Sequence, residues 1–282
     1  MTAALAFSRF GSDDPAAPTV LALHGITANG LAWQVVAGLL PGWRVVAPDL
    51  RGRGRSGELP GPFGLRRHAE DLAELLDAMG VSRAVVAGHS MGGFVAVALA
   101  ALRPELVSQL VLVDGGLPLV PPPDTTSADI VEALGPAAAR LAMEFPDEAA
   151  YLAYWRAHPA FANDWGPAVE DYARYDLTGT APHLRASASA DAMLADGAEL
   201  SGPDWYLAAL RGIRMPVDVL RAPRGLLDAE PLYEPGALEG FTSLVPQLRV
   251  TEVADVNHYT ILFADHGARR VADAIDSTRH RT

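Results

Sequence analysis

Short apolar runs alternate with helical stretches along the first part of the chain, and this alternation is the strongest constraint on its fold. Runs rich in Val, Leu and Ala predict strands over residues 19–23, 44–48, 84–87 and 109–113. Helical stretches near residues 31–40 and over residues 67–79 separate them. Such alternation is typical of a mostly parallel sheet with helices on both faces, because each parallel strand needs a right-handed crossover to reach the next. We therefore predict an α/β fold.

The alternation breaks after Asp114. From Leu117 to about Gly212 the β-branched runs vanish, and stretches with helical periodicity cover residues 127–145, 148–158, 166–176 and 190–199. Strand patterns return over residues 215–220 and 247–253, and a helix is predicted over residues 267–277. We expect a core made of residues 1–116 and 213–282, with a helical cap, residues 117–212, inserted after the strand that ends at Asp114.

A Gly-x-Ser-x-Gly pentapeptide follows the third of these strands, with Ser90 at its centre. The predicted strand before it and the predicted helix over residues 94–102 indicate a sharp turn between the two. A turn of this kind strains its central residue, and Gly88 and Gly92 leave the room that it needs. An incidental serine in a glycine-rich turn is the competing interpretation. The strand and helix on either side favour a nucleophile.

A serine hydroxyl is a weak nucleophile until a base removes its proton, so the site needs a histidine and an acid that orients it. His258 lies in the loop after the last predicted strand, at the sheet edge where the serine turn also opens. The chain order Ser, acid, His is the one expected for this architecture. The other seven histidines lie in their own turns, in predicted helices, in the cap or in the terminal segment, so His258 is the predicted base.

Three aspartates are candidates for the acid. Asp228 follows the strand near residues 217–220 in a loop at the same sheet edge, and it is the first choice. Asp114, directly at the end of a strand next to the serine strand, is the second. Asp255 is close to His258 in sequence and is favoured as a turn former.

Attack on a carbonyl carbon places negative charge on its oxygen, which two preorganised donors can stabilise. The amide of Met91 follows the nucleophile at a helix N-terminus, and the amide of Ile26 lies in the strand-ending run from Leu23 to Thr27. We predict these two amides as the oxyanion hole. Gly25 allows the chain to turn there, and the Thr27 hydroxyl can contact the substrate.

Composition excludes several classes of chemistry. The chain of 282 residues has no cysteine, and all 22 of its basic residues are arginine. Disulfides, thiolate metal sites, Schiff-base lysines and Walker-type phosphate loops are thereby excluded. The run from Gly52 to Gly57 matches a dinucleotide-loop pattern, but Pro60 and Pro62 stand where that fold needs a helix. We predict no cofactor and no metal, and a structural loop in which Arg51 and Arg55 pair locally.

The formal net charge of −12 disfavours nucleic acid and anionic membranes as partners and favours a small-molecule substrate. No stretch is apolar over the length of a membrane span, and no basic segment precedes an apolar one at the start. The expected location is the cytoplasm. The sequence leaves the oligomeric state open.

The serine turn, the His24-Gly25 loop, the run from Pro48 to Ser56 and the late His258 together resemble the α/β-hydrolase superfamily. The resemblance spans roughly residues 19–116 and 215–277 and implies a triad of Ser90, Asp228 and His258. In the usual acid loop of the family a Gly precedes Asp by three residues, whereas here Ala222-Pro223-Arg224-Gly225 occupy those positions and Asp228 comes later. Asn257 replaces the common Gly before the histidine. The serine nucleophile separates the chain from the epoxide hydrolases and haloalkane dehalogenases, which use aspartate.

The resemblance implies a cofactor-free capped serine hydrolase. The predicted reaction is hydrolysis of a carboxylic ester of a small or medium apolar substrate through an acyl-enzyme. Residues expected to contact the substrate are Thr27, Trp155, Trp165, Tyr172 and Tyr259. The same triad acting on a thioester, a lactone or a carbon–carbon bond, or in perhydrolysis, is an alternative. A non-catalytic module that binds a small molecule is another.

Overall fold

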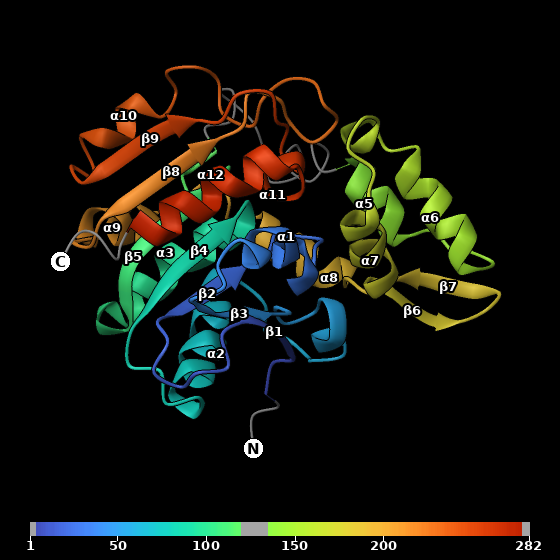
Figure 1. Cartoon of the computed structure of the whole chain (residues 1–282), viewed down its shortest axis with the longest axis horizontal. Coiled ribbons are helices and arrows are strands. Elements are labelled where there is room, and N and C mark those ends of the chain that lie inside the picture. Colours follow the sequence, from blue (N-terminus) through green and yellow to red (C-terminus); the bar gives the residue numbers. More distant parts are fainter. Residues whose placement is uncertain (1–3, 120–134, 278–282) are drawn as a thin grey trace.

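The computed structural model describes residues 4–119 and 135–277 and shows an α/β architecture (Figure 1). Seven strands form one sheet in the order β1-β3-β2-β4-β5-β8-β9. Their bounds are Phe7–Gly11 (β1), Thr19–Leu23 (β2), Arg44–Pro48 (β3), Ala84–His89 (β4), Val107–Val113 (β5), Val217–Arg221 (β8) and Leu248–Glu252 (β9). Only β1, which the sequence analysis missed, runs antiparallel to its neighbour. The predicted mostly parallel sheet is confirmed.

Strand β4 lies at the centre of the sheet and is buried along its whole length. It pairs in parallel with β2 on one side and with β5 on the other, so that Gly88 faces Leu23 and Leu112. Because parallel strands end at the same edge, this register brings together the loops that follow Leu23, His89 and Val113. Strand β8 continues the sheet beyond β5 and adds the loop that follows Arg221.

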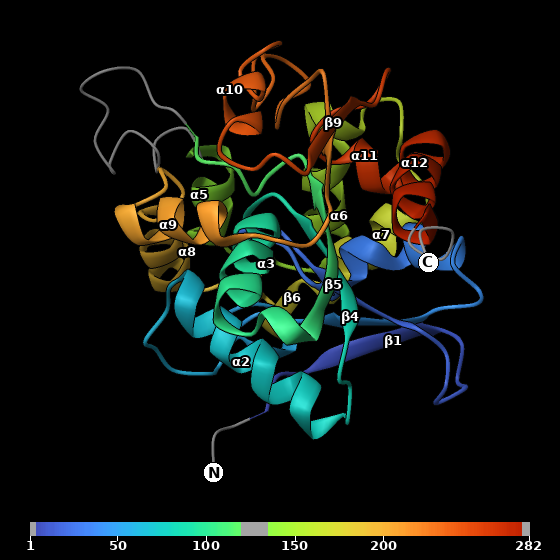
Figure 2. The same ribbon diagram turned by 90° about the vertical axis from the view of Figure 1, so that its left-hand side faces the viewer.

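The two faces of the sheet are covered by different helices (Figure 2). One face packs against α2 (Leu65–Ala78), α3 (Met91–Leu102) and α9 (Asp204–Gly212). The other packs against α1 (Gln34–Gly38), α11 (Thr260–Phe263) and α12 (Asp265–Asp276). Strand residues alternate between the two cores, with Leu110 and Leu112 of β5 in the first and Val111 and Val113 in the second. This is the period of two that a strand imposes on its side chains.

In the segment between β5 and β8, the described residues 135–197 form a cap to one side of the sheet (Figure 1), whereas α9 packs with α3 on a face of the sheet. The described helices of the cap are α5 (Gly135–Leu141), α6 (Glu148–Arg156), α7 (Pro167–Tyr175) and α8 (Ala190–Gly197). Residues 120–134, which hold part of the helix predicted over residues 127–145, lie outside the described residues. The boundaries of the cap at residues 117 and 212 stay a prediction.

The sequence analysis predicted a helical cap, but the cap also contains two strands. Strands β6 (Leu177–Thr180) and β7 (His183–Ala186) form an antiparallel hairpin. Each is four residues long, and Ala186 is the one buried residue of the two strands, so neither carries the buried apolar run by which the core strands are recognised. Helix α9 was also missed. The shorter helices are η1 (Gly30–Trp33), η2 (Gly54–Ser56), η3 (Pro104–Leu106), η4 (Pro159–Phe161) and α10 (Glu239–Thr242). Among the described residues, no helix is long and apolar enough to span a membrane.

A leucine in the sheet should contribute far more to stability than one on the surface. Leu112 in β5 is fully buried, whereas Leu102 at the end of α3 is 48% exposed. We expect Leu112→Ala to lower the free energy of unfolding by about 2–5 kcal/mol, because the truncation leaves a cavity between β5 and α3. Leu102→Ala should change it by less than about 1 kcal/mol. The midpoints of urea unfolding measure the difference, and equal midpoints would contradict this account of the core.

Candidate active site

Ser90 lies at the sharp turn between β4 and α3, as predicted. Its φ of 54° and ψ of −125° are strained values for a residue with a side chain. The neighbouring glycines make the turn possible. A Cβ atom on Gly88 would lie 2.3 Å from the Gly92 carbonyl oxygen, and one on Gly92 would lie 2.3 Å from the Leu23 carbonyl oxygen. Side chains larger than hydrogen at either position would therefore displace the backbone around Ser90.

A third glycine, which the sequence analysis missed, approaches Ser90 from the end of β5. A Cβ atom on Gly115 would lie 2.2 Å from the Ser90 carbonyl oxygen. The Ser90 amide donates to the Val113 carbonyl at 2.9 Å, so the two segments are also joined by a hydrogen bond. The Gly-Gly pair directly after a predicted central strand is the signal that could have identified this contact.

His258 is paired with Asp114. The His258 Nδ1 atom donates to Asp114 Oδ2 over 2.6 Å, and both side chains are buried. The other carboxylate oxygen, Oδ1, accepts the Ala222 amide at 3.1 Å. Asp114 is thus held by the end of β5 and by the loop after β8, and it fixes the orientation of the imidazole. With Nδ1 protonated, Nε2 is the nitrogen free to act as a base.

The first-choice acid, Asp228, is not the partner of His258, and this prediction was wrong. Its Oδ1 accepts from Arg224 Nε at 2.6 Å and from Asn257 Nδ2 at 2.9 Å. The partial burial of Asp228 opposes ionisation, but these two donors outweigh it and lower the carboxyl pKa. Arg224 and Asn257 bind Asp228, while β5 places Asp114 beside the imidazole. Asp255 has a φ of 60° and lies in a turn, as expected.

His89, which the sequence analysis assigned only to its own turn, supports the His258 loop. Its Nε2 donates to the His258 carbonyl oxygen at 2.7 Å, and the two ring centroids are 4.5 Å apart. Burial, reinforced by repulsion from His258, lowers the pKa of His89 well below its usual value. His89 is therefore neutral and carries its proton on Nε2.

Ser90 and His258 open into one small cavity of about 50 Å³. The loop of residues 25–28 forms one wall, and apolar side chains from the core and the cap form the rest. Those lining side chains include Met91, Phe94, Leu119, Ala137, Tyr172, Leu200, Leu226, Leu232 and Tyr259. Among the described residues, no hydrogen bond joins Ser90 to His258. Catalytic hydrogen bonds are often long or poorly aligned in structures without substrate.

Three of the five predicted substrate-contacting residues lie at this cavity: Thr27, Tyr172 and Tyr259. Trp155 and Trp165 are not among its lining residues, and their contact with a substrate stays a prediction. Trp155 is 2% exposed and packs against the rings of Phe161 and Tyr172 within the cap. Trp165 packs against Phe161 and lies under the Arg156 guanidinium. Aromatic residues at helical spacing serve here as the core of the cap.

The predicted oxyanion residues, Ile26 and Met91, also line the cavity. Gly25 brings the loop close to the serine, since a Cβ atom there would lie 3.3 Å from the Ser90 Cβ. The hydrogen bonds found among the described residues do not occupy the amide of Ile26 or that of Met91. Both amides are therefore available to an oxygen in the cavity, and their role stays a prediction.

The run from Gly52 to Gly57 forms a tight structural loop. It contains the 3₁₀ turn η2, and the Asp49 carboxylate accepts the Arg55 amide at 2.9 Å. Arg51 forms two hydrogen bonds with Asp71, of 2.7 and 2.8 Å, which confirms the predicted local pairing. Arg55 lies over the Tyr175 ring. In the part of the chain that the structure describes, no group of three His, Asp or Glu side chains is arranged to bind a metal ion.

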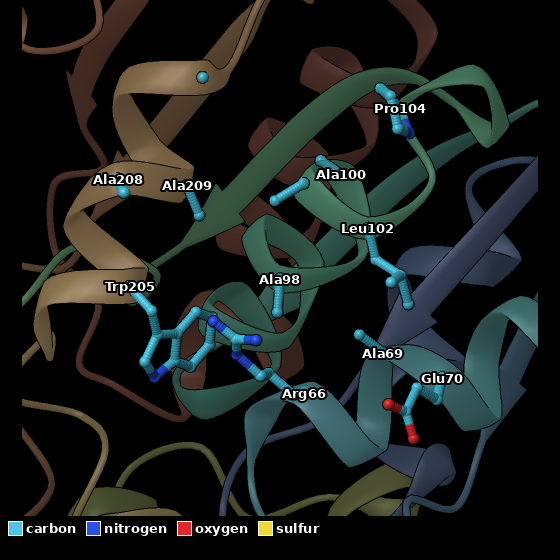
Figure 3. Close-up of a pocket in the computed structure, with 12 residues that line it drawn as sticks. Arg66, Ala69, Glu70, Ala98, Ala100, Leu102, Pro104, Trp205, Ala208 and Ala209 are labelled. Atoms are coloured by element: carbon cyan, nitrogen blue, oxygen red, sulfur yellow. The ribbon is translucent and has the colours of Figure 1, made fainter.

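A larger hollow of about 460 Å³ lies on the other side of α3, between α2 and α9 (Figure 3). Alanines 69, 98, 100, 101, 208 and 209 form much of its surface, and Arg66 stacks over the Trp205 ring at its rim. It shares no lining residue with the Ser90 cavity. It also has no histidine or serine, so the nucleophile and base lie only in the smaller cavity of the two.

Comparisons with known proteins agree with this architecture. A family model described as alpha/beta hydrolase fold matches residues 18–265. Lipase LipV of Mycobacterium tuberculosis is 44% identical over 111 residues, which are 39% of this chain and 41% of LipV. The match thus spans about two fifths of that relative. The 2-(acetamidomethylene)succinate hydrolase of Mesorhizobium japonicum is 28% identical over 243 residues, or 86% of this chain and 82% of that protein. A crystal structure of E-2-(acetamidomethylene)succinate hydrolase superposes with a TM-score of 0.80 at 24% identity, covering 97% of this chain and 95% of that one.

The two candidate acids can be distinguished by proton NMR. A proton shared between an imidazole and a buried carboxylate 2.6 Å away is deshielded and protected from exchange with water. We expect one such low-field resonance in the unmodified protein. It should disappear in Asp114→Asn and persist in Asp228→Asn, which is a matched change in a neighbouring loop. Loss of the resonance in Asp228→Asn alone would contradict the pairing.

Proposed function

The chain belongs to the α/β-hydrolase fold family, and we propose that it is a cofactor-free serine hydrolase. The proposed reaction is the cleavage of a carboxylic ester with a small or medium apolar acyl group. One observation carries the proposal: the strained Ser90 shares a cavity with His258, whose Nδ1 is bound by the buried Asp114. This is the arrangement of nucleophile, base and orienting acid that ester hydrolysis requires.

Acylation begins when Ser90 Oγ attacks the carbonyl carbon of the ester and its proton passes to His258 Nε2. A new oxygen–carbon bond forms, and the electron pair of the carbonyl moves onto its oxygen, where the amides of Ile26 and Met91 can donate to it. Asp114 stabilises the imidazolium that results. The carbonyl then re-forms, the bond to the alcohol breaks, and His258 returns its proton to the departing alkoxide oxygen. The acyl group is left on Ser90.

Deacylation repeats these steps with water. Nε2 takes a proton from water while the water oxygen bonds to the acyl carbon. When the tetrahedral intermediate collapses, the bond to Ser90 Oγ breaks and that oxygen recovers the proton from His258. A carboxylic acid leaves, and the site regains its original protonation. Each role belongs to a side chain or amide on the chain itself, so the reaction needs no further group.

The cavity lining supports an apolar acyl group. Beyond the serine, the two histidines, the Thr27 hydroxyl and the hydroxyls of two tyrosines, its walls are aliphatic or aromatic, including Leu200, Leu226 and Leu232. No arginine lines the cavity among the described residues, and the chain has no lysine. Residues 120–134, which lie outside the described residues, include no basic residue in their sequence. An anionic acyl group would therefore lose its hydration without gaining a cationic partner.

The apolar lining of the cavity does not favour the substrate for which one relative is named. The 2-(acetamidomethylene)succinate hydrolase of Mesorhizobium japonicum is named for a dicarboxylate. None of the described side chains that line the cavity is an arginine, so we propose a neutral ester instead. A thioester, a lactone or a carbon–carbon bond uses the same residues, and a panel of such substrates separates these alternatives. A binding module without turnover is tested by the reactivity of Ser90.

Replacement of the nucleophile tests the proposal directly. We expect Ser90→Ala to lower kcat for p-nitrophenyl butyrate by about 10⁴-fold or more, because the acyl-enzyme cannot form. Ser243→Ala, at an exposed serine, should retain full activity. A fluorophosphonate should add its mass to the unmodified protein and not to Ser90→Ala. Full activity in Ser90→Ala, or an unmodified protein that resists the probe, would contradict a serine hydrolase.

A pair of esters tests the predicted preference for a neutral acyl group. The p-nitrophenyl monoesters of butyric and succinic acid have acyl chains of equal carbon count, and they differ by one carboxylate. We expect kcat/KM to be at least about tenfold lower for the succinate ester, because its charge must be desolvated in an apolar cavity. The comparison should be repeated in about 1 M salt, where the Debye length is about 3 Å and long-range repulsion is screened. Equal values in high salt would refute the preference.

A further inference from the structure

The loop of residues 25–28, here called the oxyanion loop, is bound through three consecutive carbonyl groups. The Gly25 carbonyl accepts the Ala28 amide at 3.2 Å. The next two carbonyls, of Ile26 and Thr27, accept from arginine side chains, Arg53 and Arg140. The loop carries the Ile26 amide that the proposed function uses as an oxyanion donor, and the inference below rests on that function.

Arg53 lies beneath the oxyanion loop and is fully buried. Its Nε donates to the Ile26 carbonyl at 2.9 Å, and its Nη2 lies 3.9 Å from the Met91 sulfur. It therefore contacts both residues whose amides are predicted to bind the oxyanion. Its charge is balanced by Asp196, which lies 2.5 Å from Nη1 and is fully buried as well. Asp196 also accepts from the Gly64 amide at 2.6 Å.

Arg140 reaches the same loop from the cap. Its Nη2 donates to the Thr27 carbonyl at 3.0 Å, and its Nη1 donates to the Tyr151 hydroxyl at 2.6 Å. Asp176 forms an ion pair with this guanidinium and accepts the Tyr151 hydroxyl. Arg140 and Asp176 are 2% and 1% exposed. An isolated charge would not be stable at this depth, so the cation depends on Asp176.

Both carboxylates belong to the cap, although both cations bind the core. Asp196 lies in α8, and Asp176 directly follows α7. The two ion pairs thus connect the cap to successive peptide groups of the oxyanion loop. The amide and the carbonyl of a residue belong to adjacent planar peptide units that are joined by only two rotatable bonds. Binding the Ile26 and Thr27 carbonyls therefore restricts the direction in which the Ile26 amide points.

We propose that Arg53 and Arg140 are positioning residues for the oxyanion hole, and that Asp196 and Asp176 of the cap hold them in place. The cap then contributes to catalysis through the direction of the Ile26 amide. The oxyanion forms only in the transition state and the tetrahedral intermediates. A misdirected amide should therefore lower kcat while leaving KM nearly unchanged.

The first test compares two aspartates of α8. Asp196→Asn removes the charge that holds Arg53 and keeps the size of the side chain, and Asp191→Asn alters an exposed carboxylate on the same helix. For Asp196→Asn we expect kcat for p-nitrophenyl butyrate to fall about 10- to 100-fold, with KM within about twofold of the unmodified value. Affinity for an alkyl trifluoromethyl ketone, which forms a tetrahedral adduct with the serine, should fall by a similar factor. Asp191→Asn should match the unmodified protein in each measurement.

The second test concerns Arg140 and its partners Asp176 and Tyr151. It can be carried out even if Asp196→Asn does not fold. Tyr151→Phe removes only the hydroxyl that contacts both Arg140 and Asp176. Tyr154→Phe removes a hydroxyl three residues further along the same helix, α6. We expect Tyr151→Phe to lower kcat and trifluoromethyl ketone affinity together, by about three- to tenfold. Tyr154→Phe should leave both unchanged. Measurements are made well below the melting temperature of each variant.

Hydrogen exchange separates failure of this proposal from failure of the proposed function. Peptides that cover residues 25–28 should exchange faster in Asp196→Asn and Tyr151→Phe than in their controls, whereas peptides from α3 should not. If the unmodified protein hydrolyses no ester, this exchange still decides whether the ion pairs fix the loop. Variants that lose thermal stability but keep kcat, inhibitor affinity and loop exchange unchanged would overturn the proposal and leave a purely structural role.

Discussion

The close approach of backbone segments around Ser90 is the constraint on which the rest of the site depends. Glycines 88, 92 and 115 allow β4, α3 and the end of β5 to pack with no side chain between them. The register of the sheet aligns the ends of β2, β4 and β5 at one edge. The turn at Ser90 then places the serine side chain in the cavity. The strain at one residue is sustained by a wholly buried strand before it and a largely buried helix after it.

The core could be predicted from the sequence because its central strands are buried on both faces and read as continuous apolar runs. Ser90 could be predicted because the sharp turn requires glycine at positions 88 and 92, and the sequence shows glycine at both. The acid could not, since Asp114 and Asp228 both follow parallel strands at one edge of the sheet. What separates them is a lateral contact: Arg224 and Asn257 bind Asp228, while β5 brings Asp114 to His258. Such a contact is invisible without the structure.

The cap was harder to predict for a different physical reason. Its aromatic residues recur at helical spacing, and that pattern is the same whether a ring faces a substrate or another helix. Trp155 packs inside the cap, whereas Tyr172, which also contacts Trp155, reaches the cavity. The buried ion pairs at the cap boundary were equally hidden, because Arg140 and Asp176 are 36 residues apart in sequence. Their burial makes each partner necessary to the other, and this necessity connects the cap to the core.

Two imidazoles lie in contact at the centre of the site, and they have different hydrogen-bond partners. His89 and His258 are both buried, but only His258 has a carboxylate beside its Nδ1. The pKa of His89 is lowered by burial and then by its neighbour, so it stays neutral and keeps donating to the His258 carbonyl. In the proposed reaction, the carboxylate beside Nδ1 favours His258 over His89 as the acceptor of the Ser90 proton. Because His89 remains uncharged, it adds no repulsion to the positive charge that develops on His258 in the proposed reaction, and Asp114 is the carboxylate beside that charge.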